Sequence, residues 1–487
     1  MTWPDGQPLE LDPRARRLAA GRVLLGGAPG RLLRLGTAGP QALVDLECGA
    51  PTHTPAVRKL GRSLVDAGLA HPRPRPVSVA EVTVVIPVKD RTGELAACLS
   101  RLTGLTVLVV DDGSRDPAAV AAVARTHGAE VLHCKVSGGP GVARNTGLAR
   151  VSTAFAAVVD SDVLVPPGWL EELLGHFADP RLAAVAPRIV GAPGSSTLAR
   201  YAAARSPLDL GRRAALVRPG SPVAYLPTAV AVLRMAALPR PVFDPQLRYG
   251  EDVDLFWRLH DQGWLVRYDP SVVAEHSEPM TWNAWYRRRF AYGTSAAPLS
   301  VRHPQRLTPI VLRPWPTLAA VLLLARRPAL AAAVAAVPTV RLARTLSASG
   351  VPRGQAALAA GRLVATGIGG TALGTGSTLA VVGGPVGWLA AGWMSTGRPA
   401  VGRRATRRPV TGRPATRRPA VGRSGQLAVL LAAPPLLDWW QRRPALDPLR
   451  WTALRLADDA AYGAGLWWGC WRHRTLRPVR PATSPPR

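Results

Sequence analysis

Acidic residues recur at four points in the middle of the chain, and their spacing suits chemistry on a nucleotide. The four segments are VVIPVKDR, VLVVDDGS, AAVVDSDVLVP and YGEDVDLFWRL. Three of them place the acids directly after a β-branched apolar run, which predicts a buried strand, and the fourth places them at the start of an apolar helix. The acids are Asp90, Asp111–Asp112, Asp160 with Asp162, and Glu251–Asp252. Carboxylates at the carboxyl ends of parallel strands line the crevice where open α/β sheets bind nucleotides. The pattern therefore predicts a site that holds a nucleotide diphosphate through a metal ion, binds a sugar and supplies a catalytic base.

The first three groups of acids can divide the work of holding a sugar nucleotide. Asp90 and Asp112, at predicted strand ends, are placed to hydrogen-bond a uracil edge and a ribose. Asp160 and Asp162 are two residues apart, so their side chains lie on the same side of an extended chain. One can face the ribose while the other reaches a cation, and Mg²⁺ or Mn²⁺ prefers such oxygens together with phosphate oxygens. Each motif alone is weak, since Ser114 or Asp112 in a DDGS turn also suits a helix cap; the ordered set is the signal.

Residues 77–303 alternate between strand and helix patterns, and this alternation predicts the sheet that positions the acids. VTVVIPV, Leu105–Val110, AEVLHC and AFAAVVD have the composition of strands. LAACLSRL and PAAVAAVARTHG have the composition of helices, and GPGVARNTGLARV that of a helix start. We therefore expect an α/β domain with a doubly wound, mostly parallel sheet.

Residues 1–76 have a different pattern, which predicts a small α+β unit. Two short strand patterns flank the turn sequence Gly-Gly-Ala-Pro-Gly, and Pro55–Ala70 places apolar residues at helical spacing. The run HPRPRPV then breaks any helix and is expected to act as a linker. The unit suggests a winged-helix-like module and resembles the carrier-type peptide-recognition domain of peptide-derived cofactor pathways, such as that of the PQQ precursor. The alternative is a small structural cap on the neighbouring domain.

The chain becomes strongly apolar over residues 304–397. One apolar run is interrupted by Arg326–Arg327, whereas Leu363–Met394 carries no charge and is long enough to cross a bilayer. Residues 424–487 begin with a shorter apolar segment that ends in Trp439–Trp440 beside arginines, a composition typical of a membrane interface. We expect this helical region to associate with a membrane, by spanning it or by lying on its surface. The alternative is an alanine-rich, buried helical domain.

Residues 398–423 form a low-complexity repeat that is rich in arginine and proline. RPAVGR occurs at both ends of it and ATRRP twice inside. Because such a segment has almost nothing to bury, we expect it to be disordered and dispensable for catalysis. A polybasic loop beside a membrane segment favours the cytoplasmic side, so the expected location is the cytoplasmic face of the cell membrane.

Charge and cysteine content limit the partners and the compartment. The formal net charge is +30 at pH 7, and arginine supplies nearly all of it. The sequence has no zinc-finger spacing and no basic helix with base-reading polar residues, so anionic lipid is the expected partner rather than nucleic acid. The 4 cysteines form no CxxC pair, which argues against structural zinc and a disulfide framework and suits a reducing cytoplasm. The N-terminal segment lacks the apolar core of a secretory signal.

The ordered motifs resemble those of the family 2 glycosyltransferases, which have the GT-A fold. The resemblance covers roughly Val82–His276 and rests on VIPVKD, VDDGS, GPGVARNTG, DSD and GEDVDL. It implies that Asp90 and Asp112 bind the nucleotide. It also implies that Arg144 of GVARNTG approaches the uracil or the diphosphate; the alternative for Arg144 is an arginine on an ordinary helix face.

The same resemblance implies the catalytic roles. Asp162 would hold the metal ion, and Asp252 would be the general base that takes the acceptor proton while the hydroxyl attacks the anomeric carbon and UDP departs with inversion. Glu251 is the competing base, and Asp254 is a weaker rival because it lies one helical step off that face. His276 in VAEHSEP would be a third metal ligand, as in some relatives, or a structural histidine.

One departure from the family pattern limits the product. The QxxRW motif of processive polysaccharide synthases is missing after GEDVDL, where the chain continues as MTWNAWYRRRFAYGTSAAPLSVRHP. This argues against a long-chain polysaccharide synthase. Arg287–Arg289 in this segment could neutralise the diphosphate leaving group, or could form a solvated basic helix face.

Further features narrow the resemblance. The N-terminal module, RRRFAYGTSAAPLSVRHP and RRPALDPLRWTALRLADDAAYGAGLWWGCWRHRTL together resemble the mycofactocin-system glycosyltransferases of actinobacteria. This implies that β-linked glucose moves from UDP-glucose to a hydroxyl of the peptide-derived redox cofactor mycofactocin or its precursor, repeatedly, to build an oligosaccharide. Two alternatives remain open: a transferase acting on polyprenyl phosphate or another lipid or polysaccharide acceptor, and a non-catalytic nucleotide-sugar sensor.

Overall fold

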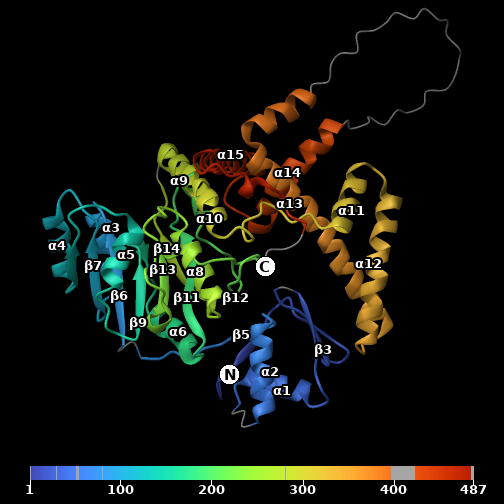
Figure 1. The fold of residues 1–487 in the computed structure, drawn as a ribbon, viewed down its shortest axis with the longest axis horizontal. Coiled ribbons are helices and arrows are strands. Elements are labelled where there is room, and N and C mark those ends of the chain that lie inside the picture. The colour runs from blue at the N-terminus through green and yellow to red at the C-terminus, as the bar shows by residue number, and fades with distance from the viewer. Residues whose placement is uncertain are drawn as a thin grey trace, which may run out of the picture.

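The computed structural model describes residues 2–28, 30–50, 54–78, 81–279, 281–395 and 423–483. They form a small N-terminal module, a central α/β domain and a set of C-terminal helices (Figure 1). The predicted fold class is confirmed in all three parts. The repeat expected to be disordered lies outside the described residues except for Arg423, so that expectation stays a prediction.

The central domain is built on one mixed sheet with the strand order β10-β14-β11-β13-β9-β6-β7-β8 and β12 paired to β14. In one half of the sheet, the neighbouring strands β9, β6, β7 and β8 are parallel, as the alternating pattern predicted. Strand β13 runs antiparallel to both β9 and β11, so the sheet is parallel only in blocks. The strands are β6 (Val82–Val88), β7 (Thr106–Asp111), β8 (Glu130–His133), β9 (Phe155–Val159), β10 (Val163–Leu164), β11 (Leu182–Gly191), β12 (Ala215–Leu216), β13 (Val230–Arg234) and β14 (Leu265–His276).

Helices cover both faces of this sheet because its central strands are apolar on both sides. In β6, Val84 and Ile86 face one core cluster while Val85 faces the other. The first cluster is completed by α3, α4 and α6, and the second by α5 and α8. The helices of the domain are α3 (Thr92–Leu99), α4 (Pro117–Thr126), α5 (Pro140–Leu148), α6 (Trp169–Gly175), α7 (Thr197–Ala204), α8 (Glu251–Asp261), α9 (Trp282–Thr294) and α10 (Ala296–Arg302), with 3-10 turns at His176–Ala178 and Met235–Ala237.

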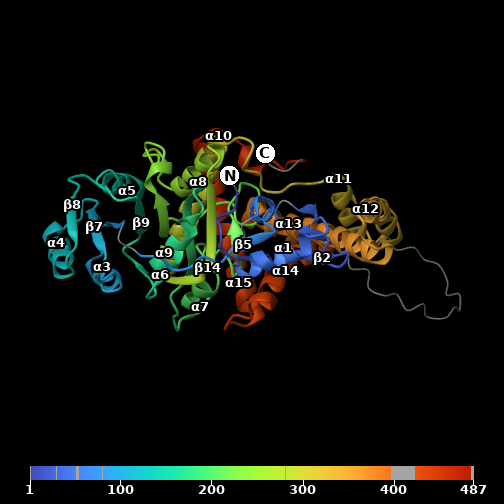
Figure 2. The ribbon, with the colours of Figure 1, turned by 90° about the horizontal axis from the view of Figure 1, so that it is seen from below.

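The N-terminal module has two small sheets and two helices, and Figures 1 and 2 place it between the central domain and helices α12 and α13. Its elements are β1 (Leu9–Leu11), β2 (Arg16–Leu18), β3 (Val23–Gly26), β4 (Arg31–Arg34), α1 (Gly39–Cys48), α2 (Pro55–Asp66) and β5 (Ala70–Pro72). The two strands around the glycine-rich turn and the helix after Pro55 agree with the sequence pattern, whereas α1 and β2 were not predicted. The linker interpretation of HPRPRPV is wrong at its start, because His71 pairs with Glu10 in β5–β1 and hydrogen-bonds Asp12 at 3.1 Å.

The C-terminal region is helical throughout its described residues. It consists of α11 (Pro314–Leu324), α12 (Pro328–Ala348), α13 (Arg353–Ser395), α14 (Arg423–Arg442) and α15 (Pro448–Arg472), followed by a 3-10 turn at Arg477–Val479. Arg326, with a φ of 58°, separates α11 from α12, and Gly384 interrupts α13. Helix α15 packs along α9, so this region is joined to the central domain.

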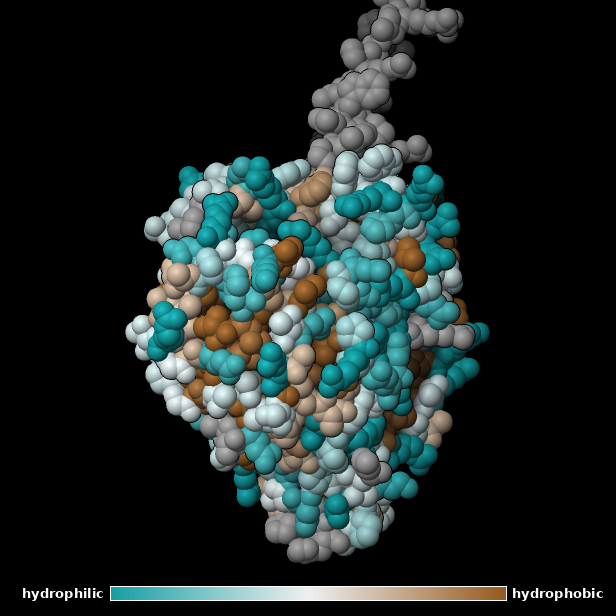
Figure 3. Space-filling model, turned by 60° about the vertical axis from the view of Figure 1, so that its left-hand side comes forward, coloured by the Kyte–Doolittle hydropathy of each residue, from teal (hydrophilic) through white to brown (hydrophobic). Residues whose placement is uncertain are grey.

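The surface of the molecule is uneven in polarity. Figure 3, in which the side of the central domain comes forward, shows hydrophilic residues over much of that face and a group of hydrophobic residues among them. Elsewhere, large apolar side chains stand exposed on α11, α12 and α13, among them Leu318, Leu330, Val337 and Leu358. Much of the exposed apolar surface therefore lies on these three helices.

Candidate active site

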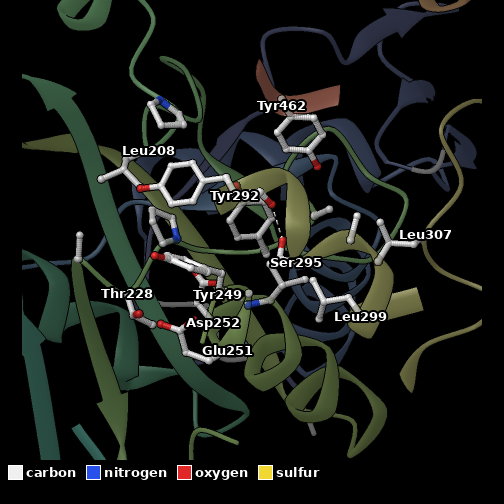
Figure 4. Close-up of a pocket in the computed structure, with 18 of the residues that line it drawn as sticks. Leu208, Thr228, Tyr249, Glu251, Asp252, Tyr292, Ser295, Leu299, Leu307 and Tyr462 are labelled. Carbon is white, nitrogen blue, oxygen red and sulfur yellow. Dashed lines mark hydrogen bonds between the residues drawn. The ribbon is translucent and has the colours of Figure 1, made fainter. Parts of the chain in front are cut away.

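A cavity of about 920 Å³ opens where the strand ends of the sheet meet α8, α9, α10 and α15. Figure 4 shows Glu251 and Asp252 projecting into it from the start of α8, with Tyr249, Tyr292 and Tyr462 around the same space. The sequence-predicted residues that line the cavity are Arg144, Asp160, Glu251, Asp252, His276 and Arg289. Asp90, Asp112 and Asp162 do not line it.

Asp252 is fixed at the first turn of α8. Gly250 precedes the helix with a φ of 81°, and a Cβ at this position would lie 2.8 Å from Leu299 Cδ1, so only glycine suits this turn. The Oδ1 atom of Asp252 accepts a hydrogen bond of 2.7 Å from the Val253 N–H. Burial, reinforced by the negative charge of Glu251, raises the pKa of Asp252 to about 7. A carboxyl with such a pKa is suited to accept a proton near neutral pH.

Arg144 joins three elements of the site. Its Nη1 lies 3.1 Å from Glu251 Oε1 on α8, and its Nη2 lies 2.5 Å from Asp160 Oδ1 after β9. The guanidinium also stacks 5.6 Å from the ring centre of Phe243. Burial alone would lower the pKa of Arg144, but Asp160 and Glu251 outweigh it and raise the pKa. Arg144 is therefore a charged bridge that holds the two carboxylates in place, and Glu251 is less free than Asp252 to act as a base.

Asp254, the weaker rival for the base, points into a different network. It is 1% exposed, its Oδ2 accepts a 2.7 Å hydrogen bond from Arg258, and its Oδ1 lies 2.9 Å from His303 Nε2. Burial raises the pKa of Asp254, but the bonds from His303 and Arg258 outweigh this and lower it. Asp254 thus ties α8 to α10 and its following turn, outside the cavity.

Asp162 and His276 are brought together by strand pairing. Val163 pairs with His276 in the β10–β14 ladder, which leaves Asp162 Oδ2 3.7 Å from His276 Nε2. This is too long for a hydrogen bond but suits two ligands that share one cation. Arg91 also pairs with Asp162, and the buried His276 Nδ1 has no hydrogen-bond partner among the described residues.

The donor set at this place fits a divalent ion that is completed by substrate. No cluster of three or more potential His, Cys, Asp or Glu ligands occurs in the described part of the chain. One carboxylate and one imidazole would therefore need phosphate oxygens or water to fill the coordination sphere, which is how Mg²⁺ and Mn²⁺ commonly bind beside nucleotides.

The side chains of Asp90 and Asp112 accept hydrogen bonds from the loops that follow the strands. Asp112 is buried, and its carboxylate accepts bonds from the N–H groups of Gly138 (2.8 Å) and Gly139 (2.9 Å) and from the Ser137 hydroxyl (2.8 Å). Asp90 is exposed, has a φ of 58°, and accepts a 2.7 Å bond from the Arg115 N–H. Neither Asp112 nor Ser114 caps α4, whose cap is Asp116. In this structure the two predicted nucleotide ligands shape the turns of the crevice.

Comparisons with known proteins indicate the family to which the chain belongs. The family model for glycosyl transferase family 2 matches residues 83–239, which include the β6, β7 and β9 strand ends. Over 98% of its length the chain is 40% identical to the pre-mycofactocin glycosyltransferase of Mycobacterium tuberculosis, in strains CDC 1551 / Oshkosh and ATCC 25618 / H37Rv, and covers 98% of that protein. The chain belongs to the pre-mycofactocin glycosyltransferase family.

Solved structures give weaker likenesses. A mannosyltransferase from Pyrobaculum calidifontis in complex with GDP-Man and Mn²⁺ is 21% identical, with 60% of this chain and 82% of that chain covered and a TM-score of 0.36. Residues 1–349 of S. aureus TarS in complex with UDP are 17% identical, with coverages of 44% and 65% and a TM-score of 0.32.

In this family 2 glycosyltransferase the predicted Arg289 meets two residues of α15 that the sequence motifs did not reveal. Arg289 turns inward, pairs with Asp458 of α15 and lies 5.8 Å from the ring centre of Tyr462, so the solvated-face alternative is wrong for this arginine, although Arg287 is exposed. Asp458 and Tyr462 both line the cavity. The available signal was the small-residue spacing Gly465–Gly469 in the same helix, which permits close helix packing.

Proposed function

We propose that the chain is an inverting transferase that moves a hexose from a UDP-sugar, with glucose as the expected sugar, to a hydroxyl of pre-mycofactocin. The observation that carries the proposal is Asp252, a cavity carboxyl whose pKa of about 7 suits a base, in a chain that matches pre-mycofactocin glycosyltransferases over its whole length. Repeated transfer would extend the product to an oligosaccharide.

The chain's own residues support a single displacement. Asp252 would take the proton from the acceptor hydroxyl while that oxygen attacks the anomeric carbon from the side opposite the departing UDP. The C–O bond to the diphosphate breaks as the new glycosidic bond forms, so the anomeric configuration inverts. The Arg144 bridge between Asp160 and Glu251 would keep the base and the crevice acids in a fixed relation.

We assign the metal position to Asp162 and His276, with Mg²⁺ or Mn²⁺ as the ion. The 3.7 Å separation of Asp162 Oδ2 and His276 Nε2 supports this assignment, and Glu278 Oε1 lies 3.6 Å from His276 Nδ1 on the other side of the ring. When bound, the ion would neutralise charge that develops on the leaving diphosphate. Arg91 would then have to release Asp162, since both bind the same carboxylate.

We also propose that the enzyme works at the cytoplasmic face of the membrane. Pro328–Ala348 and Arg353–Gly384 are long and apolar enough to cross a bilayer, and few of their residues are buried inside the protein. The chain has no acidic residue between Glu278 and Asp438, whereas arginine recurs on both sides of the uncharged segment Leu363–Met394. Such a surface is complementary to anionic headgroups. The exposed helices also favour a second candidate acceptor, a polyprenyl phosphate.

The decisive experiment offers both acceptors to the purified full chain with UDP-glucose and Mn²⁺. We expect pre-mycofactocin to gain one or more hexose masses, with a β linkage seen by NMR, and polyprenyl phosphate to stay unchanged. Transfer to the lipid phosphate alone would replace the proposed acceptor. A protein that binds UDP-glucose without transfer or hydrolysis would instead be the nucleotide-sugar sensor.

A further inference from the structure

We infer that the tyrosine-lined side of the cavity is the acceptor subsite, and that Tyr462 of the C-terminal helix α15 is a specificity-determining residue within it. The ligand that fits this wall is neutral, with an apolar body that carries hydroxyl or carbonyl groups. The inference rests on the proposed function, because it takes Asp252 as the base toward which the acceptor hydroxyl must point.

Four tyrosines from four places in the chain surround Asp252. Tyr225 and Tyr249 come from loops of the central domain, Tyr292 from α9 and Tyr462 from α15, and all four line the cavity. Tyr249 and Tyr292 meet edge to face, with ring centres 6.2 Å apart and an interplanar angle of 78°. Figure 4 shows three of these rings around the space into which Asp252 projects.

The hydroxyl groups of these tyrosines are available to a ligand. None of the four hydroxyls donates or accepts a hydrogen bond within the described part of the chain, although the Tyr201 hydroxyl nearby is satisfied by Asp458 at 3.2 Å. A tyrosine hydroxyl in a protein interior usually finds a partner. Burial raises the pKa of Tyr292 to about 12 and also raises the pKa values of Tyr225 and Tyr462, so these groups are neutral donors at neutral pH.

The charges around the wall argue against an anionic acceptor. Most arginines that line the cavity are already paired: Arg144 with Asp160, Arg205 with Asp438, Arg289 with Asp458, Arg306 with Asp261 and Arg442 with Asp438. Among the cavity arginines of the described chain, Arg248 alone has no carboxylate partner, and it is exposed. Aliphatic side chains fill the gaps between the rings, including Leu208, Leu299 and Leu307. This wall offers apolar contact and neutral hydrogen bonds.

Tyr462 reaches the cavity because α15 lies unusually close to α9. A Cβ on Gly293 would lie 2.1 Å from the Tyr462 carbonyl oxygen, and one on Gly465 would lie 1.9 Å from the Phe290 carbonyl oxygen. Only glycine permits this approach of the two backbones. The acceptor side of the site is thus incomplete without α15, which lies outside the segment that the family model matches.

The test is Tyr462→Phe, which removes the hydroxyl and keeps the ring beneath Arg289. With pre-mycofactocin and UDP-glucose, we expect the KM for the acceptor to rise about three- to tenfold, the loss typical of one neutral hydrogen bond. The KM for UDP-glucose should not change. The matched control is Tyr286→Phe on α9, whose ring is 47% exposed and stacks on Phe290 outside the cavity.

Two kinetic results would overturn the inference. A higher KM for UDP-glucose with an unchanged acceptor KM would assign the wall to the donor, and no change in either would remove Tyr462 from the site. Binding of 4-nitrophenyl β-glucoside and of dodecyl phosphate, measured by calorimetry on the wild-type chain and on Tyr462→Phe, separates this inference from the proposed function. The glucoside should bind and lose affinity in the variant even if pre-mycofactocin is not a substrate, whereas preferential binding of the phosphate would contradict the neutral subsite.

Discussion

The N-terminal module and the C-terminal helices both flank the glycosyltransferase domain, but they meet it in different ways. The module docks through buried charge: Arg62 of α2 lies 2.7 Å from Asp179, and their side chains are only 7% and 3% exposed. The C-terminal region docks through close backbone contact between α9 and α15 at Gly293 and Gly465. Among the described residues of the two regions, only those of the C-terminal one line the cavity, including Arg442, Asp458 and Tyr462.

This difference indicates which flanking region belongs to the catalytic machinery. An ion pair fixes the position of the module without bringing its side chains to the substrate, so the module can act as a cap or as a separate recognition unit. Contact between the backbones of α9 and α15 brings Asp458 and Tyr462 to the cavity. Disrupting the two interfaces separately should therefore affect stability and acceptor kinetics differently.

The largest effect should come from Asp252, the proposed base in the cavity that the C-terminal region helps to line. Asp252→Asn keeps the size of the side chain but cannot take a proton, so we expect kcat to fall about 10²- to 10⁴-fold with the melting temperature nearly unchanged. Asp254→Asn is the control: it should lower the melting temperature through loss of the His303 and Arg258 contacts and leave kcat within a fewfold of wild type. The reverse outcome would exchange the roles of the two aspartates.

Breaking the module's interface should cost stability without changing acceptor kinetics. Arg62→Gln leaves Asp179 buried without its cation, for which we expect a loss of about 3–5 kcal/mol in the free energy of unfolding. Arg17→Gln, which removes an exposed ion pair with Glu47 in the same module, should cost about 1 kcal/mol or less. Denaturant unfolding and steady-state kinetics on the folded fraction give the two readouts. A raised acceptor KM in Arg62→Gln would show that the module takes part in the site.

Breaking the C-terminal interface should disturb both properties. Gly465→Ala places a methyl group against the Phe290 carbonyl, so we expect a loss of about 1–3 kcal/mol in stability and a higher acceptor KM, because α15 must shift. Gly93→Ala on the exposed start of α3, where a Cβ would meet nothing within 4 Å, should leave both quantities unchanged. If Gly465→Ala lost stability alone, the contribution of α15 to the cavity would be structural only.

The smallest effect is a shift in pH dependence that reports on Asp252 itself. Because burial and the Glu251 charge hold the pKa of Asp252 near 7, the base is protonated and inactive below that pH. kcat should therefore fall about tenfold per pH unit below about 7 and level off above it. Glu251→Gln removes the neighbouring negative charge and so lowers the pKa of Asp252. The pH below which kcat falls should therefore move down by about one unit. Glu94→Gln, on the exposed start of α3, should not change this pH. If Glu251→Gln also left it unchanged, the effect of the Glu251 charge on the pKa of Asp252 would be contradicted.

Much of the catalytic half could be predicted because its signals are local. A β-branched run followed by aspartate predicts a buried strand that ends at a carboxylate, and β6, β7 and β9 each have this form. The uses of the acids were less predictable. Asp112 bonds to Gly138 and Gly139, more than 20 residues further along the chain, and Arg144 pairs with Glu251 across 107 residues. No local sequence pattern predicts with which of several carboxylates an arginine will form an ion pair.

The flanking regions show the same limit. Helix α1 went unpredicted because it is short and bounded by glycines, and His71 was assigned to a linker because prolines surround it, although Glu10 holds it in a strand pair. The apolar C-terminal pattern predicted helices but did not indicate that α15 would reach the catalytic domain, since that contact depends on glycines that face each other across the α9–α15 interface.

By itself the sequence determined which catalytic groups the protein has, namely an ordered set of carboxylates at strand ends and the acids of the GEDVDL helix start. It also determined the match to one glycosyltransferase family along the whole chain. The tertiary structure decided which carboxylate stays free as a base and which side chains enclose the acceptor. The physical reason is that strand and helix patterns depend on residues that are neighbours in the sequence. The pairing of Arg144 and the approach of Tyr462 depend on charge and close packing between residues that are distant in the chain and meet only after folding.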